Sequence, residues 1–104
     1  MQVHQNLSIL FYRKRKKVDK EWYMPIYCRM TVDGLQYEKS AGLKVLNHQW
    51  DHEVKQVLPA NPFYKAYNKK LGQMKTDLER HFNFVVAKKG LATPALVFES
   101  YKTI

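Results

Sequence analysis

The side chains in this 104-residue chain that could support catalysis or bind a metal are four histidines and a single cysteine. His48 and His52 are four residues apart, which suits zinc when both lie on one helix, but the residues between them are typical of a loop. Cys28 falls on the apolar face of an expected strand, and no histidine is placed to activate its thiol. Phosphate-binding loops, nucleophile elbows and paired-carboxylate motifs are absent from the sequence. We therefore expect no metal, no cofactor and no active site.

The charge of the chain indicates a different chemistry. Its 18 Lys and Arg residues against 9 Asp and Glu leave a net charge of +9, while 45% of the residues are hydrophobic, enough for a buried core. A small, folded and basic domain is a candidate for binding a polyanion. The lone cysteine favours a reducing compartment, and the sequence shows neither a signal peptide nor a long apolar run. These features predict a cytosolic protein.

The densest basic segment is the run of residues 13–17. Its members are Arg13, Lys14, Arg15, Lys16 and Lys17. One interpretation is a solvated loop between two strands, and the other is a clamp that neutralises DNA phosphates beside a sheet. We favour the clamp because the run flanks a strand face that the sequence pattern predicts to be polar.

Strands must position these groups, and the first half of the chain has the pattern of an antiparallel sheet. Residues 7–13 are rich in β-forming side chains, and apolar residues alternate from Tyr23 to Val32. Asp33-Gly34 follows, a hairpin signal because both central positions of a type I′ turn need positive φ. The resulting register places three pairs on the core face: Val32 with Leu35, Met30 with Tyr37, and Ile26 with Ala41.

The opposite face of this hairpin is polar, with three facing pairs: Thr31 with Gln36, Arg29 with Glu38, and Tyr27 with Ser40. Such a face suits base edges in the roughly 12 Å wide major groove of DNA. Glu38 repels phosphate, so it either orients Arg29 or accepts a hydrogen bond from cytosine. The expected base contacts are Tyr27, Arg29, Thr31, Gln36 and Ser40, and Lys44 is expected to add a phosphate contact. Lys39 falls on the core side, so either its stem follows the sheet edge or the register is shifted by one.

The second half of the chain has helical spacing. Asn61-Pro62 supplies a side-chain cap and a proline for the first helical position, and Gly90 follows a basic last turn. The apolar stripe between them comprises Tyr64, Tyr67, Leu71, Met74, Leu78, Phe82 and Val85. It is longer than a small sheet, so we expect residues 82–86 to offer apolar surface to a partner or a following domain. A shorter helix is expected over residues 95–101.

The expected fold class is therefore α+β. It consists of a three-stranded antiparallel β-sheet packed on one long α-helix, with a short C-terminal helix.

Three segments of the chain resemble a known family. They are Ser8–Lys14, Pro25–Gly34, and Ser40–Val45 with the following Trp50-Asp51. Over residues 7 to about 90 the sequence resembles the N-terminal arm-type DNA-binding domain of bacterial tyrosine recombinases, the phage-integrase-like enzymes of conjugative transposons and prophages. The Pro-Ile-Tyr-x-Arg and Gly-Leu-Lys-Val-x(4)-Trp-Asp motifs are its most specific parts.

This resemblance implies a sheet laid in the major groove of arm sites that flank the recombination core. It implies an arm-type domain over residues 1–90 and a linker or the start of the following core-binding domain over residues 91–104. The catalytic residues of such recombinases belong to a C-terminal domain, so we expect this chain not to be an enzyme by itself. The implied partners are double-stranded DNA, the remaining recombinase domains and neighbouring protomers on DNA, in the bacterial cytoplasm and at the nucleoid.

The predicted function is sequence-specific binding of double-stranded DNA at arm-type sites, in support of site-specific integration and recombination. Two other functions stay open at this stage. An RNA-binding module would need exposed aromatic side chains to stack unpaired bases, and Tyr27 is the clear candidate on the polar face. A protein-interaction module would use the apolar end of the long helix instead of the sheet.

Overall fold

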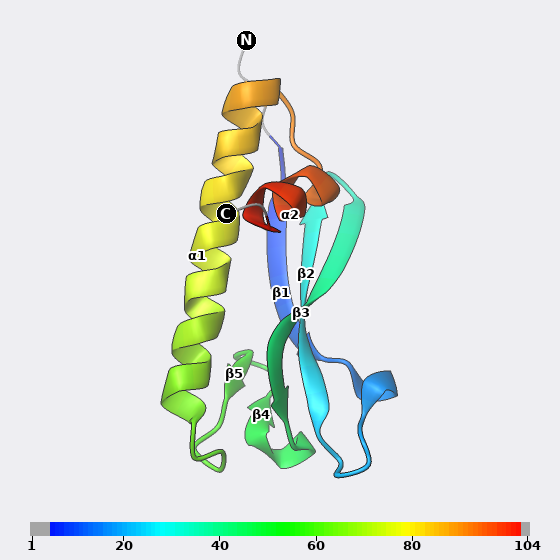
Figure 1. The fold of residues 1–104 in the computed structure, drawn as a ribbon, viewed down its shortest axis with the longest axis vertical. Coiled ribbons are helices and arrows are strands. Elements are labelled where there is room, and N and C mark those ends of the chain that lie inside the picture. Colours follow the sequence, from blue (N-terminus) through cyan, green and yellow to red (C-terminus); the bar gives the residue numbers. More distant parts are fainter. Residues whose placement is uncertain (1–4, 103–104) are drawn as a thin grey trace.

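The computed structural model describes residues 5–102 and has the α+β architecture that the sequence predicts. Strands β1 (Leu7–Arg13), β2 (Met24–Val32) and β3 (Leu35–Val45) form an antiparallel sheet in that order. Helix α1 (Tyr64–Lys89) runs along one face of this sheet, and α2 (Pro94–Lys102) packs against the upper part of both α1 and the sheet (Figure 1).

Strand β2 is the centre of the sheet, and its side chains alternate as its sequence predicts. Its fully buried positions are Ile26, Cys28, Met30 and Val32. Asp33 and Gly34 both adopt positive φ, 49° and 85°, which confirms the predicted turn. The predicted pairs from Val32–Leu35 to Tyr27–Ser40 are also confirmed.

The pairing predicted between Ile26 and Ala41 is wrong. Ile26 pairs with Leu43, because the register shifts by two residues at this point. Gly42 has φ 80°, and its N–H donates to Ser40 Oγ at 3.1 Å. Glycine adopts this conformation without strain, so β3 bends here while Ala41 stays buried.

Lys39 pairs with Cys28, so the predicted register holds at this position. The lysine is half-buried and lines a hollow beside α2 together with Ala95 and Phe98. Its stem therefore follows the sheet edge, as one of the two sequence interpretations required.

A second, smaller hairpin of β4 (Trp50–Asp51) and β5 (Gln56–Val57) had no clear signal in the sequence. The Asp51 carboxylate accepts hydrogen bonds from the N–H groups of Glu53 at 2.9 Å and Val54 at 3.2 Å, which closes its turn. Trp50 is only 5% exposed and belongs to the hydrophobic core, at the end of the molecule where Figure 1 shows β4.

Helix α1 begins two residues later than the sequence predicts. Asn61 is buried, and its side chain bonds both Gln49 Oε1, at 3.2 Å, and the N–H of Phe63, at 2.8 Å. Asn61 thus stabilises a turn before the helix, and Pro62 lies in that turn. The C-terminal end is as predicted, since Gly90 has φ 80° and donates its N–H to the Val86 carbonyl at 2.8 Å.

Helix α2 completes the hydrophobic core. Val97 and Phe98 are buried in the same cluster as Val85 of α1. Phe82 and Val86 also pack against this cluster. The apolar end of α1, which the sequence left for a partner or a following domain, is therefore largely covered by this chain's own second helix.

Candidate nucleic-acid interface

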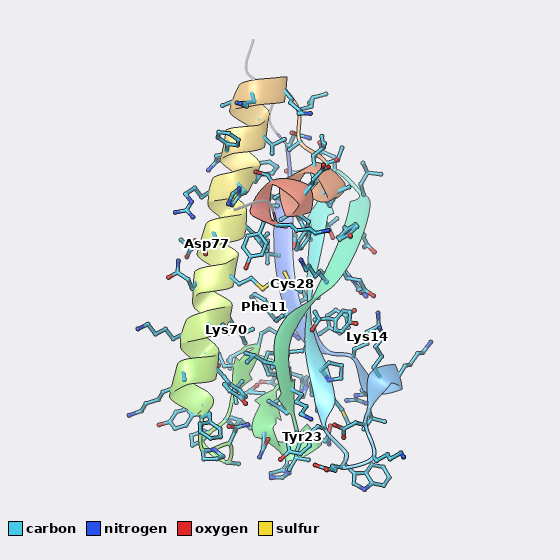
Figure 2. All side chains as sticks on the ribbon, viewed as in Figure 1. Phe11, Lys14, Tyr23, Cys28, Lys70 and Asp77 are labelled. Atoms are coloured by element: carbon cyan, nitrogen blue, oxygen red, sulfur yellow. The ribbon has the colours of Figure 1, made fainter. Side chains whose placement is uncertain are left out.

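The outer face of the sheet, meaning the face turned away from α1, carries alternate residues of all three strands. Its members are Ser8, Leu10 and Tyr12 of β1, Tyr27, Arg29 and Thr31 of β2, and Gln36, Glu38 and Ser40 of β3. Directly paired residues in an antiparallel sheet lie on the same side, so the strand register alone gathers this set. Figure 2 shows Phe11 and Cys28 between the sheet and α1, and Lys14 on the other side.

Glu38 is the hydrogen-bond acceptor at the centre of the outer face. Its Oε1 accepts from Lys14 Nζ, and its Oε2 accepts from the Tyr12 hydroxyl and, at 3.3 Å, from the Arg29 guanidinium. The Arg29 guanidinium also lies over the Tyr12 ring, 4.8 Å from its centroid. Arg29 is therefore held between partners on both neighbouring strands.

The charges in this cluster shift one another's pKa values. Lys14, then Tyr12 and Arg29, lower the pKa of Glu38 to about 2. The hydrogen bond to Glu38 in turn raises the pKa of Lys14 and that of Arg29. Burial, followed by Glu38, raises the pKa of Tyr12. At neutral pH one carboxylate thus faces two cations, and the cluster keeps a net positive charge.

Tyr27 joins the basic loop to the sheet. Lys14 Nζ lies 4.4 Å and Lys17 Nζ 5.2 Å from the centroid of its ring, and Lys17 also donates to its hydroxyl at 2.8 Å. These are cation–π contacts, which position the two ammonium groups over the ring. They hold the short 3-10 turn η1 (Arg15–Lys17) against the outer face.

Arg13 lies apart from this cluster. It ends β1 opposite Ile26, and its guanidinium donates to the backbone carbonyl of Asn47 at 3.0 Å and to the side-chain oxygen of the same residue. Burial, followed by the charge of Arg15, lowers the pKa of Arg13. Arg13 is one of the predicted phosphate contacts, but its side chain already joins the end of β1 to the 3-10 turn η2 (Asn47–Gln49), which follows β3.

Lys44 lies on the outer side of β3, beside the loop that follows η1. Its ammonium group pairs with Asp19 at 3.2 Å and lies 5.1 Å from the centroid of the Tyr23 ring. The backbone N–H of Tyr23, together with Lys44 and the N–H of Glu21, lowers the pKa of Asp19. Lys44 thus carries its charge at the rim of the sheet.

Four further predicted residues are accessible. Arg15 and Lys16 are exposed in η1, and neither forms an ion pair within residues 5–102. Thr31 and Gln36 face each other near the β2–β3 turn, and Gln36 lines a shallow hollow with Arg29. The structure therefore places the predicted lysines and base-contact candidates on or beside the outer face of the sheet. Among the predicted residues, Arg13 is the one that lies apart from them.

One residue of this surface, and one exposed residue of the loop between η1 and β2, were missed in the sequence. Tyr12 occupies its centre, and extending the register to β1, where Tyr12 pairs with Tyr27, would have found it. Trp22 lies in the loop before β2 with φ 71° and is 73% exposed. No spacing or motif distinguishes Trp22, because its position depends on the shape of the loop.

Within residues 5–102 the side chains considered for catalysis are not assembled into a site, and His4 lies outside these described residues. His48 lies in η2, whereas His52 lies in the β4–β5 turn, so they do not share a helix. Burial raises the pKa of the Cys28 thiol to about 12, far from the range of a reactive thiolate. Within residues 5–102 no three potential ligands form a metal-binding group, and no helix has the length and apolarity to cross a membrane.

The comparison with protein families gives one result that bears on this surface. The family model described as Arm DNA-binding domain matches residues 10–97, which include β2, β3, α1 and most of β1. The chain belongs to this family. It is an arm DNA-binding domain, the N-terminal arm-type domain of phage-integrase-like recombinases, and the resemblance seen in the sequence is confirmed.

Neither the curated proteins nor the solved structures compared with the chain give a match. DNA binding is therefore assigned to the arm DNA-binding domain from its family. The matched residues contain the whole cluster around Glu38, the η1 turn and Lys44, so the basic outer face lies within the family's domain.

Proposed function

We propose that this arm DNA-binding domain binds double-stranded DNA sequence-specifically at arm-type sites, with the outer face of its sheet in the major groove. The observation that carries the proposal is the composition of the outer face: Arg29 and Lys14 surround a single carboxylate, while the opposite face is buried under α1 and α2. In the full protein this binding would serve site-specific integration and recombination by a tyrosine recombinase.

The dimensions of the sheet support the fit. Neighbouring strands lie about 4.8 Å apart, so three strands span about 10 Å between the outer two backbones. The major groove is about 12 Å wide and admits a β-ribbon. The strand at the middle of this sheet is β2, so Arg29 and Thr31 would lie deepest in the groove.

The other basic and polar side chains are assigned to phosphates or to bases by their position in the structure. Arg15, Lys16 and Lys17 lie in η1 beside the sheet, and Lys44 lies at its rim, so we assign these side chains to phosphates. The base contacts are assigned to Tyr27, Arg29, Thr31, Gln36 and Ser40. Asp19 would give up its pairing with Lys44, or share it, when a phosphate approaches.

The aromatic side chains of the outer face favour duplex DNA over single-stranded RNA. Lys14 and Lys17 lie over the Tyr27 ring, and Arg29 lies over the Tyr12 ring. A ring that holds a cation against its face lacks the open surface on which an unpaired base would stack. These rings thus serve to position cations.

The partners and location follow from the same proposal. We propose that the full protein contains the remaining recombinase domains and contacts neighbouring protomers on DNA. We also propose that it is located in the bacterial cytoplasm, at the nucleoid.

The proposal is tested by the change Arg29→Ala. A bidentate arginine contact to a base contributes about 1–3 kcal/mol of discrimination, so the variant should lose that much of the difference between arm-site and random duplex. Both affinities are measured by fluorescence anisotropy at one fixed salt concentration. Arg80→Ala on α1 is the matched control, because it removes the same charge from an exposed side chain away from the sheet.

An unchanged ratio of the two affinities for Arg29→Ala would remove this residue from base recognition. Competition with a single-stranded RNA of the same length separates duplex binding from RNA binding. If the RNA displaces the arm-site duplex at equal concentration, the assignment to double-stranded DNA is wrong.

A further inference from the structure

Strand β1 forms an edge of the sheet, and half of its backbone hydrogen-bonding groups are left open. Asn6 accepts from the N–H of Asp33 at 3.1 Å, and Lys14 donates to the Pro25 carbonyl at 2.9 Å. Bonded pairs alternate in an antiparallel ladder, so the even-numbered residues between these two also bond to β2. The N–H and C=O groups of Leu7, Ile9 and Phe11 therefore point away from the sheet. Within residues 5–102 they have no hydrogen-bond partner.

The other edge of the sheet is less regular. Strand β3 bends at Gly42, and α2 packs against the inner face of β3, with the rings of Tyr37 and Phe98 at a centroid distance of 5.1 Å. Natural proteins usually block exposed edges with bends, charges or a covering element. Strand β1 has a regular, unbent register over all seven residues and contains neither proline nor glycine. Strand β1 is therefore the more regular of the two edges and the better template for an added strand.

A groove runs beside this open edge, between β1 and α1. One part has a volume of about 300 Å³ and is lined by Ile9, Phe11, Leu71 and Gly72 among others. A second part of about 220 Å³ continues past Leu7, and both parts share Ile9 and Lys75. A strand added beside β1 would therefore lie along this groove, over apolar side chains, and could pair with the outward-pointing backbone groups of β1.

Gly72 is an independent sign that this groove is kept open. It lies in the interior of α1, and its φ is not positive, so the helix backbone does not require glycine there. Glycine costs about 1 kcal/mol relative to alanine at such a position. A Cβ atom at Gly72 would meet nothing within 4 Å, so packing inside the domain does not require glycine either. The space beside Gly72 leaves room for another chain to approach the helix backbone closely.

The charged side chains at the rim of this groove indicate which kind of chain could bind in it. Lys55 and Lys75 line the groove, and neither forms an ion pair within the part of the chain that the structure describes. A second copy of this chain, with its own net charge of +9, would be repelled. Glu79 lies at the far end, in the smaller part of the groove. The larger part therefore suits an acidic chain.

We propose that the β1 edge binds an extended acidic segment of a partner protein, which adds to the sheet as a fourth strand. Its backbone would pair with the open groups of Ile9 and Phe11, and acidic side chains at alternate positions would face Lys55 and Lys75. This surface is the edge of the sheet, whereas the outer face carries the proposed DNA contacts. The inference therefore does not depend on the proposed function, and both ligands can bind together.

The test uses a defined probe, a blocked peptide of alternating Glu and Val, about nine residues long like a typical strand. Hydrogen exchange of individual amides is followed by NMR with and without the peptide. We expect slower exchange at the Ile9 and Phe11 amides, which point into the groove, and no change at the Leu10 amide, which already bonds to β2. Peptide affinity is measured in parallel by calorimetry.

Two variants block the site in different ways. Ile9→Pro removes an outward N–H that the sheet does not use, and Gly72→Leu fills the groove from the helix. Each should weaken peptide binding about tenfold or more, the effect of losing one or two hydrogen bonds or the space for a strand. Ile9→Val is the matched control and should bind like the parent, because it keeps the N–H. The circular dichroism of all variants is compared with that of the parent to confirm folding.

Four outcomes would overturn the proposal. They are equal affinity for a peptide of alternating Lys and Val, exchange changes confined to the η1 turn, displacement of the peptide by a short DNA duplex, and self-association of the domain that slows the same two amides. The first two would show unselective or misplaced charge binding. The third would assign the groove lysines to DNA, and the fourth would assign the edge to a second copy.

Discussion

Glu38 determines the arrangement of the outer face at the scale of single residues. A carboxylate on the proposed DNA-binding face would repel phosphate, but Glu38 accepts hydrogen bonds from Tyr12, Lys14 and Arg29, which come from both neighbouring strands and the adjoining loop. Of the two roles open for Glu38 in the sequence, orienting Arg29 is supported by this geometry. Fixing the guanidinium before binding lowers the entropy lost when DNA is bound.

Replacing Glu38 with Gln tests this role through pH. The pKa of Glu38 is lowered to about 2 in the folded protein, from an ordinary value of 4.5. A carboxyl group whose pKa is lower in the folded than in the unfolded protein stabilises the fold at pH values above its ordinary pKa. This stabilisation is lost as the pH falls toward 2. The Gln variant should therefore be less stable at pH 7 by about 1 kcal/mol, the usual scale for a partly exposed charged hydrogen bond. The difference should vanish near pH 2.

Urea unfolding at a series of pH values measures this difference. Glu53→Gln is the control, since its carboxylate forms no ion pair within the described residues. A Glu38→Gln deficit that stays constant between pH 5 and about 2 would mean that the charge of Glu38 does not stabilise the cluster.

At the scale of elements, the 3-10 turn η1 places basic side chains beside the sheet without burying any of them. Lys16 and Lys17 are both exposed, and Lys17 also donates a hydrogen bond to the Tyr27 hydroxyl. The sequence left this run open between a solvated loop and a phosphate clamp. The contact with Tyr27 supports the clamp, because it holds the turn against the outer face.

Changing both Lys16 and Lys17 to Ala tests the clamp. Each lost phosphate contact should lower the slope of log K against log salt concentration by about 0.9, and binding to all duplexes should weaken alike. Duplex affinity is measured over a range of salt concentrations. Lys88 and Lys89, at the opposite end of the molecule on α1, provide a double-alanine control of equal charge. A slope that falls equally in both variants would show that net charge, and not the clamp, sets the salt dependence.

At the scale of the whole molecule, α2 determines how much of the chain folds as one unit. Phe98 is 4% exposed, its ring lies 5.1 Å from that of Tyr37 of β3 in a tilted arrangement, and it belongs to the same core as α1. The predicted boundary after residue 90 implies that the arm domain folds without this helix. The packing leads us to expect the reverse.

Phe98→Ala should lower the free energy of unfolding of the whole domain by about 3–5 kcal/mol, the usual cost of removing a buried phenylalanine side chain. Thermal and urea unfolding followed at the sheet and at α1 would measure it. Lys102→Ala, on the exposed side of the same helix, should change stability little. If Phe98→Ala melts α2 alone and leaves the midpoint of the sheet unchanged, α2 belongs to a separate unit.

The sequence by itself determined the features that depend on neighbouring residues. Alternation and the Asp33-Gly34 turn predicted β2, the hairpin and its register as far as Tyr27, because a two-residue turn admits one pairing. Helical spacing and Gly90 predicted the body and the end of α1, since both are local to the chain.

Only the tertiary structure decided the features that depend on contacts between distant segments. The bend at Gly42, the delayed start of α1 at the buried Asn61, and the cover that α2 provides all result from packing between elements. The grouping of Tyr12, Lys14 and Arg29 around Glu38 likewise required the register of β1 on β2. A single sequence records which residues are polar, but the distances between them are fixed by the fold, so charge and spacing predicted a DNA-binding face without predicting its central cluster.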